Sequence, residues 1–275
     1  MQLSRLTTLF VAVAALSACG KDKVTDPAFP ALAGVRFING VNDTSAIDIR
    51  AIDQIEFSPI GNALAYRAAT EHQPTEAKDR HFRAFITSTN PAITSNPIID
   101  FTVTFAANSR YTVLLTGGAR TKVNFVLIND DAPTSAAGQI AIRSVNASTG
   151  AIDAYVVDST VTPLGSPAAT NVAPLATAPY VGRATGKVAM RVTPAGSATV
   201  AASQQGPPAP AQPAGALPAA GVTTAGTPFS VYFFPAGVSG SPTAPTTGTA
   251  SCTGTAPAAA CSPTVVWFVD RVPTS

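Results

Sequence analysis

Charged side chains are scarce in this sequence, since Asp, Glu, Lys and Arg together make up 12% of its 275 residues. The formal net charge of +2 leaves no concentrated basic face, so nucleic acid is excluded as a partner. Long stretches with helical periodicity are also missing, while Ala, Thr, Val, Pro, Gly and Ser dominate. This composition is typical of an exported β protein rather than of a helical cytosolic enzyme.

Motifs of the common enzyme classes are missing as well. The sequence has no G-x-S-x-G elbow, phosphate-binding loop or dinucleotide fingerprint. Its only histidines, His72 and His81, fall in the polar segment 71–81, where Lys78 and Arg80 oppose cation binding and a proline interrupts any shared helix. We therefore predict no catalytic residue, no metal and no cofactor, and a solvated loop at this segment. An envelope hydrolase or metal-dependent enzyme that uses this loop is the alternative.

Hydrophobic runs long enough to span a membrane are absent too, because a spanning helix needs about 20 apolar residues. The longest run, 9–16, follows Arg5 and leads into Leu16-Ser17-Ala18-Cys19. This ending resembles the lipobox of bacterial lipoproteins, in which the cysteine is acylated and the chain is cut just before it. We expect residues 1–18 to be a removable signal peptide. Residues 19–33 would then form the lipidated Cys19 and a flexible tether.

The lipid would attach the chain to a membrane of the bacterial cell envelope. Lasting attachment takes more than one acyl chain, at about 0.8 kcal/mol per buried methylene. In enteric bacteria an Asp directly after the lipidated cysteine retains lipoproteins in the inner membrane, and here that position is Gly20. This residue favours the outer membrane.

Two cysteines are left once Cys19 carries lipid. Cys252 and Cys261 form an isolated pair in an exported chain, where disulfides persist. Their spacing is not that of a C-x-x-C redox or metal motif, so we predict a disulfide that closes a loop of about ten residues.

Four blocks of the sequence recur in the same order. They are 35–40 with 142–147, 46–48 with 151–153, 110–115 with 228–233, and 126–133 with 266–273. We therefore predict two homologous domains, 34–133 and 134–275, and mobile Pro- or Ser/Thr-rich loops near 203–220 and 237–263 of the second domain.

Apolar residues alternate with polar ones in both domains. Phe101, Val103 and Phe105 alternate with threonines, and Phe229 and Val231 belong to a similar run. Alternation places one set of side chains on a buried face and the other toward water. About seven short strands per unit predict an all-β protein made of two tandem antiparallel β-sandwiches.

A polar pair also recurs, since Arg36 and Asp48 return as Arg143 and Asp153. By alternation both members of each pair face away from the apolar set. If the first two strands of each sandwich pair antiparallel, we expect a cross-strand Arg–Asp pair on the outer face of each domain. Such a pair would help to set the strand register. A ligand site built from the same residues is the functional alternative.

The repeated opening resembles the bacterial domain of unknown function 4397. Segments 35–49 and 142–156 carry this resemblance, and 190–197 is similar to the central strand and turn of that family. The resemblance implies an Ig-like fold in an exported protein, often in tandem copies behind a lipobox. It implies no activity.

We thus expect a non-catalytic envelope lipoprotein that acts as a binding, adhesion or scaffolding module. An envelope protein or a polysaccharide is the expected class of partner, and the oligomeric state is left open. A carbohydrate-binding module is a second alternative, although Trp267 corresponds to Leu127 in the repeat, which favours a core position over a stacking platform.

Overall fold

The computed structural model describes residues 29–53, 60–117, 122–211, 220–238 and 261–273. Contacts divide the chain into the units Met1–Ala31 and Leu32–Ser275, and every described strand belongs to the second unit. Residues 1–18, Cys19 and Cys252 lie outside the described residues, so the lipid anchor and the disulfide stay predictions. No helix within the described ranges is long and apolar enough to cross a membrane.

The described residues form sixteen strands and the short helix α2 (Pro91–Thr94). The first repeat contains β1 (Leu32–Val41), β2 (Ala46–Ala51), β3 (Gly61–Ala65), β4 (Gln73–Glu76), β5 (Asp79–Ile86), β6 (Ile99–Thr104), β7 (Arg110–Gly117) and β8 (Asn124–Asn129). The second repeat contains β9 (Gln139–Asn146), β10 (Ile152–Asp158), β11 (Ala169–Val172), β12 (Val181–Ala184), β13 (Val188–Pro194), β14 (Ala202–Gln205), β15 (Pro228–Phe234) and β16 (Thr264–Val269). The predicted all-β class is confirmed, with eight strands in each repeat where about seven were expected.

Each repeat is a sandwich of two four-stranded sheets. The inner sheets, as we call them, have the strand orders β4-β1-β7-β8 and β12-β9-β15-β16. The outer sheets have the orders β3-β2-β5-β6 and β11-β10-β13-β14. Most neighbouring strands are antiparallel, but β1 pairs with β7 in parallel and β9 pairs with β15 in the same way.

Alternating apolar residues fill the space between the two sheets of each repeat. In the first repeat Phe37 from the inner sheet meets Phe82 from the outer sheet, with ring centroids 5.1 Å apart. In the second repeat Ile142 and Phe229 share a core with Met190 from the outer sheet. The period-two pattern thus identified the inward side chains because successive residues of a strand face opposite sides of its sheet.

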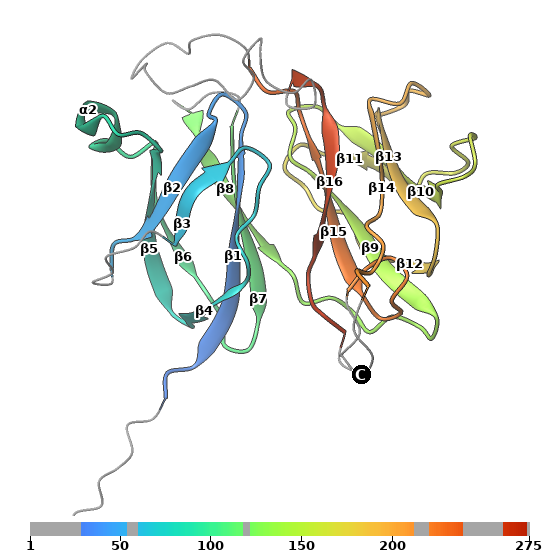
Figure 1. The fold of residues 1–275 in the computed structure, drawn as a ribbon, viewed down its shortest axis with the longest axis horizontal. Coiled ribbons are helices and arrows are strands. Elements are labelled where there is room, and N and C mark those ends of the chain that lie inside the picture. Colours follow the sequence, from blue (N-terminus) through green and yellow to red (C-terminus); the bar gives the residue numbers. More distant parts are fainter. Residues whose placement is uncertain (1–28, 54–59, 118–121, 212–219, 239–260, 274–275) are drawn as a thin grey trace, which may run out of the picture. The chain divides into compact units, whose positions relative to one another are not determined.

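A third apolar cluster joins the two inner sheets face to face. It contains Ile38 and Leu114 from the first repeat and Val145, Tyr232 and Phe234 from the second. The sheets therefore stack in four layers, which Figure 1 shows as outer, inner, inner and outer sheet. Strands β1 and β9 are therefore buried on both faces, including their polar residues Arg36, Asn39, Arg143 and Asn146.

The predicted cross-strand Arg–Asp pairs are wrong. Arg36 lies on β1 of the inner sheet, whereas Asp48 lies on β2 of the outer sheet. Arg143 on β9 and Asp153 on β10 are separated in the same way. The arginines do face away from the core of their own sandwich, but that face is covered by the other repeat and not by water.

Asp48 and Asp153 have a different structural role. The carboxylate of Asp48 accepts a hydrogen bond from the Ala63 amide at 2.8 Å, and that of Asp153 accepts one from the Asn171 amide at 2.7 Å. Both amides belong to residues with a φ of 48°, next to a register shift in the pairing of β2 with β3 and of β10 with β11. These aspartates therefore stabilise equivalent β-bulges.

The segment 71–81 is not the solvated loop that we predicted. Gln73–Glu76 forms the edge strand β4 against β1, and β5 already begins at Asp79. Pro74 is compatible with this strand because an edge strand does not need every amide for its ladder.

The loop predicted near 203–220 begins later, because Ala202–Gln205 forms β14 against β13. The indole Nε1 of Trp267 donates a hydrogen bond to the Gln204 carbonyl at 3.3 Å, and its ring packs against the core of the second repeat. Residues 212–219 and 239–260 lie outside the described residues.

Candidate binding site at the interface of the two repeats

Arg36 crosses from the first repeat into the second. Its guanidinium donates to Asp270 Oδ1 at 2.5 Å and to the Val269 carbonyl at 2.8 Å, both at the end of β16. Its Nε donates to Thr112 Oγ1 at 2.6 Å, on the neighbouring strand β7. The side chain is only 3% exposed, so this charge is held by protein groups instead of water.

Arg143 repeats this arrangement in the opposite direction. It donates to Asp130 Oδ1 at 2.6 Å, to the Asn129 carbonyl at 2.8 Å and to Ser230 Oγ at 2.7 Å. Each repeat thus supplies an arginine to the carboxylate of the other. This reciprocity is the pattern of a two-fold, isologous interface, here formed by two halves of one chain with equivalent strand orders.

Each central carboxylate also receives a hydroxyl from its own repeat. Thr112 donates to Asp130 Oδ2 at 2.5 Å, and Ser230 donates to Asp270 Oδ2 at 2.8 Å. The two halves differ in the next partner of each carboxylate. His72 Nε2 lies 3.1 Å from Asp130 Oδ2, while Tyr180 donates to Asp270 Oδ2 at 2.8 Å. We call Arg36, Thr112, Asp130, Arg143, Ser230 and Asp270 the interface network.

The two carboxylates of the network have opposite pKa shifts. Burial raises the pKa of Asp130, but the hydrogen bond with His72 and the charges of Arg36 and Arg143 outweigh this effect and lower it below 3.8. Burial also raises the pKa of Asp270, and there the arginine charges only partly offset the effect.

The interface network fixes how the two inner sheets face each other. A buried ion pair adds little net stability over an apolar replacement, because desolvation offsets the attraction. Loss of one partner is costly, however, since it leaves a buried charge uncompensated. The network therefore disfavours any shift of one repeat along the other, because a shift would break these reciprocal bonds.

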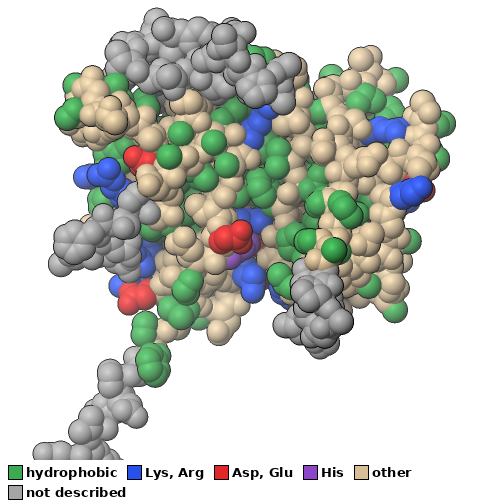
Figure 2. Space-filling model, in the orientation of Figure 1, with side chains coloured by type: hydrophobic (Ala, Val, Ile, Leu, Met, Phe, Trp, Pro, Cys, Tyr) green, Lys and Arg blue, Asp and Glu red, His purple; other side chains and the backbone are tan. Residues whose placement is uncertain are grey.

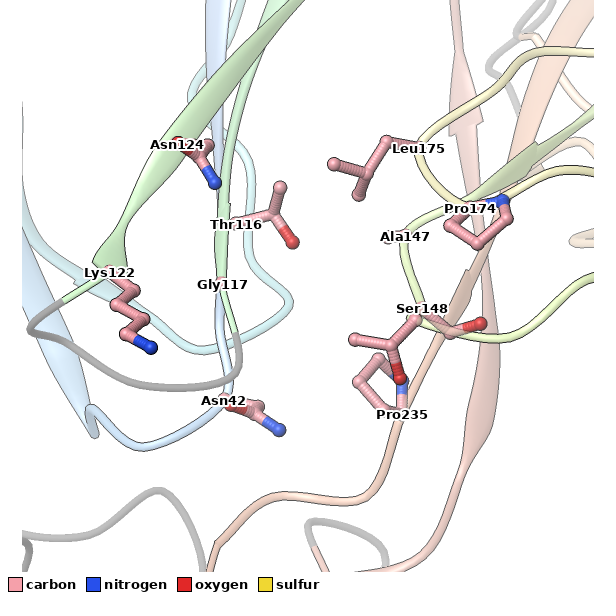
Figure 3. A pocket seen from close by; sticks show the side chains of 11 residues that line it. Asn42, Thr116, Gly117, Lys122, Asn124, Ala147, Ser148, Pro174, Leu175 and Pro235 are labelled. Atoms are coloured by element: carbon pink, nitrogen blue, oxygen red, sulfur yellow. The ribbon is translucent and has the colours of Figure 1, made fainter.

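A cavity of about 450 Å³ lies beside this interface. The first repeat contributes Asn42, Thr116, Gly117, Lys122 and Asn124 to its wall. The second repeat contributes Ala147, Ser148, Thr149, Pro174, Leu175 and Pro235. Figure 3 shows Lys122, Asn124 and Thr116 on one side of the cavity and Leu175 and Pro174 on the other.

The interface has a second place that corresponds to this cavity, and there the side chain of Arg67 from the first repeat fills the space. Arg67 and Leu175 correspond, because the Arg67 amide donates to the Asn39 carbonyl at 2.7 Å and the Leu175 amide donates to the Asn146 carbonyl at 2.8 Å. Both residues have a positive φ, of 70° and 62° respectively. The sequence around them, Ala-Tyr-Arg-Ala at 65–68 and Ala-Pro-Leu-Ala at 173–176, preserves the two alanines.

Arg67 closes its side of the interface. Its guanidinium donates to the carbonyls of Pro235 and Ser262, at 2.6 Å each, and lies 4.7 Å from the centre of the Tyr66 ring. The Tyr66 hydroxyl also donates to the Pro235 carbonyl, at 2.7 Å. Leu175 has no donor with which to make these contacts.

Strand register identifies the counterparts of the two carbonyls that Arg67 binds. Thr112 pairs with Arg36 as Ser230 pairs with Arg143, so Thr112 and Ser230 are counterparts. Gly117 and Pro235 each lie five residues further along the chain and therefore correspond as well. The pairing of β7 with β8 and of β15 with β16 makes Lys122 the counterpart of Ser262. Gly117 and Lys122 both line the cavity. The cavity is therefore the part of a pseudo-symmetric interface where leucine stands in place of arginine.

The two histidines that the alternative enzyme would need lie apart. His72 precedes β4 and contacts Asp130 of the inner sheet, whereas His81 lies on β5 and contacts Asp100 of the outer sheet. Within the described ranges no group of three or more His, Cys, Asp or Glu could hold a metal ion. Among the other candidate residues, Cys261 is described but its predicted partner Cys252 is not.

Comparison with known families matches residues 33–155 to the domain of unknown function DUF4397. This part of the chain is therefore similar to the DUF4397 family. The DUF4397 match runs from β1 into β10, so it covers the first sandwich, strand β9 and the first part of β10. It includes Arg36, Thr112, Asp130 and Arg143 of the interface network.

Similarity beyond the DUF4397 match is weak. No curated protein matches the chain. An α-glucan-binding streptococcal virulence factor is 10% identical, with a TM-score of 0.22, over 63% of this chain and 86% of its own. Family 41 carbohydrate-binding modules from streptococcal virulence factors are 7% identical, with a TM-score of 0.21 and the same coverage. A multi-modular glycogen-degrading pneumococcal virulence factor is 14% identical, with a TM-score of 0.22, over 61% of this chain and 18% of its own. Such low TM-scores support no argument about the ligand.

Proposed function

We propose that this protein is a non-catalytic lipoprotein of the bacterial cell envelope, which binds a ligand in the cavity between its two repeats. Leu16-Ser17-Ala18-Cys19 supports attachment by lipid, and Gly20 supports the outer membrane. The observation that carries the binding function is the cavity itself, whose wall both repeats build. Its volume falls in the range of roughly 300 to 1,000 Å³ that small-molecule sites occupy.

The cavity wall supports binding better than catalysis. Lys122 is the one ionisable side chain among its lining residues. A hydroxyl nucleophile needs an adjacent base, and general acid–base chemistry needs a titratable group near the reacting atom. Thr116, Ser148 and Thr149 line the cavity with no histidine or carboxylate among the other lining residues.

The interface network supports the same function. It holds the two halves of the cavity in one arrangement, so a ligand would find a preformed site and would not have to order it. The face drawn in Figure 2 carries its Lys and Arg side chains in several separate places, which favours a defined site over a broad charged surface.

Arg67, the counterpart of Leu175 on the first repeat, suggests a variant that tests this proposal. We expect Leu175→Arg to fill the cavity as Arg67 fills the corresponding space, at a backbone position where arginine already occurs with positive φ. Purified full-length protein would be incubated with a small-molecule extract of the producing bacterium's envelope. Bound compounds would then be released by denaturation and identified by mass spectrometry.

We expect the wild-type protein to retain a compound that Leu175→Arg does not retain. Leu175→Met is the matched control, because it conserves volume and leaves the cavity open. Asn124→Trp obstructs the cavity from an exposed position of the first repeat, in case the arginine is not accommodated. Equal retention by the wild type and both obstructed variants would rule out the cavity as the ligand site.

A further inference from the structure

We infer that the ligand of this cavity is a saccharide bearing a carboxylate, a uronic acid unit, whose charge is bound by Lys122. The inference rests on the proposed function and specifies its ligand class. It follows from the charge, the hydrogen-bonding groups and the apolar wall of the site.

The charge of the site selects an anionic ligand. Lys122 has an exposed side chain at the wall of the cavity, and none of the ion pairs between described residues involves it. A carboxylate placed against its ammonium group would gain an attraction that no other lining residue opposes. A basic peptide would be repelled by the same group.

Neutral polar groups surround this charge. Thr116 and Thr149 provide hydroxyls and Asn124 provides an amide, so the wall offers both donors and acceptors. Sugar hydroxyls also donate and accept, whereas the carboxylate of a simple fatty acid could use only the donors. The wall is thus better suited to a polyhydroxylated acid.

The counterpart site indicates where ligand hydroxyls would donate. There the Arg67 guanidinium uses the carbonyls of Pro235 and Ser262. The corresponding residues at the cavity are Gly117 and Lys122, which face Leu175. A donor-rich ligand takes the place that arginine fills on the other side.

An apolar wall completes the site. Pro174, Leu175, Pro235 and Ala147 line the second-repeat side together with Ser148 and Thr149, and Lys122, Thr116 and Asn124 lie across from them. A pyranose ring has a face of C–H groups that can pack on such a wall while its hydroxyls point to the polar side. An inorganic anion would leave both the wall and most of the volume of about 450 Å³ unused.

Calorimetric titration of the full-length protein with trigalacturonate, and separately with neutral galactotriose, tests this inference. We expect the acidic trisaccharide to bind at least about tenfold more tightly than the neutral one at low salt. Lys122→Gln should remove this preference without abolishing binding of either sugar. Leu175→Arg should abolish binding of both.

Three other outcomes would overturn the inference. Equal affinity for the two sugars would show that charge is not selected, and equally tight binding of triglutamate would show that hydroxyls are not. The third outcome is that none of trigalacturonate, galactotriose and triglutamate binds. If the envelope extract still yields a compound that Leu175→Arg loses, only the ligand class is wrong. If the extract yields none, the proposed function fails as well.

Discussion

Asp130 is the residue on which most of the interface network converges. It accepts hydrogen bonds from Thr112 and Arg143, contacts His72, and lies 3.5 Å from Arg36 Nη2. A neutral amide would keep only one acceptor oxygen for these contacts and would carry no charge to offset the arginines.

We predict that Asp130→Asn lowers the free energy of unfolding by about 3 kcal/mol or more, because it leaves Arg143 buried with its charge uncompensated. Urea denaturation of the two proteins at neutral pH measures this difference. The control is Asp131→Asn at the exposed neighbouring position, where a carboxylate oxygen accepts a hydrogen bond from the Arg110 amide at 3.0 Å. There the change should stay within about 1 kcal/mol.

The same variant should show a defined pH dependence. The pKa of Asp130 is lowered from 3.8 in the folded protein, so its stabilising contribution is complete above that value and is lost as the pH falls through the folded pKa. The difference in unfolding free energy between wild type and Asp130→Asn should therefore shrink as the pH falls below about 3.8. If the difference in unfolding free energy stays constant down to about pH 2, the pKa of Asp130 is not depressed as described.

At the scale of elements, the bulge between β2 and β3 shows how a carboxylate that recurs in both repeats stabilises the fold. Asp48 accepts hydrogen bonds from the Ala63 amide and from the Thr87 hydroxyl, so it connects β3, β2 and the end of β5. Ala63 has a φ of 48°, and its counterpart Asn171 has the same value. Asparagine tolerates this left-handed conformation better than alanine.

We predict that Ala63→Asn stabilises the protein by about 0.5 to 1 kcal/mol, because it places the better residue at an exposed left-handed position. Thermal unfolding followed by circular dichroism measures the gain. Asn171→Ala is the reciprocal variant and should lose a similar amount. A loss of stability in Ala63→Asn would mean that the bulge does not tolerate the longer side chain.

For the whole molecule, the proposed lipid anchor decides where the two sandwiches act. We predict that Cys19→Ser releases the protein from the membrane fraction, because the acylated thiol would be its attachment. Fractionation of cells before and after a carbonate wash, followed by immunoblotting, measures this. Cys261→Ser is the matched control and should leave the protein in membranes. If Cys19→Ser stays with the membranes after the wash, lipid at Cys19 is not the anchor.

The local pattern of the sequence predicted the strands, the repeated blocks and the inward-facing apolar residues. In the strand registers, Thr112 and Ser230 lie at equivalent places beside Arg36 and Arg143. Alternation sufficed for this because the two-residue period of a strand is a local property of the backbone.

Long-range pairing decided the remaining features. Alternation placed Arg36 and Arg143 on the side away from their own core, but it could not show that the other repeat covers that side. Their partners, Asp270 and Asp130, lie 234 and 13 residues away, at the ends of β16 and β8. The cavity also depends on long-range packing, because residues of both repeats line it. The Leu175 counterpart of Arg67 is visible in the sequence, but only the packing of two inner sheets turns that substitution into an open site.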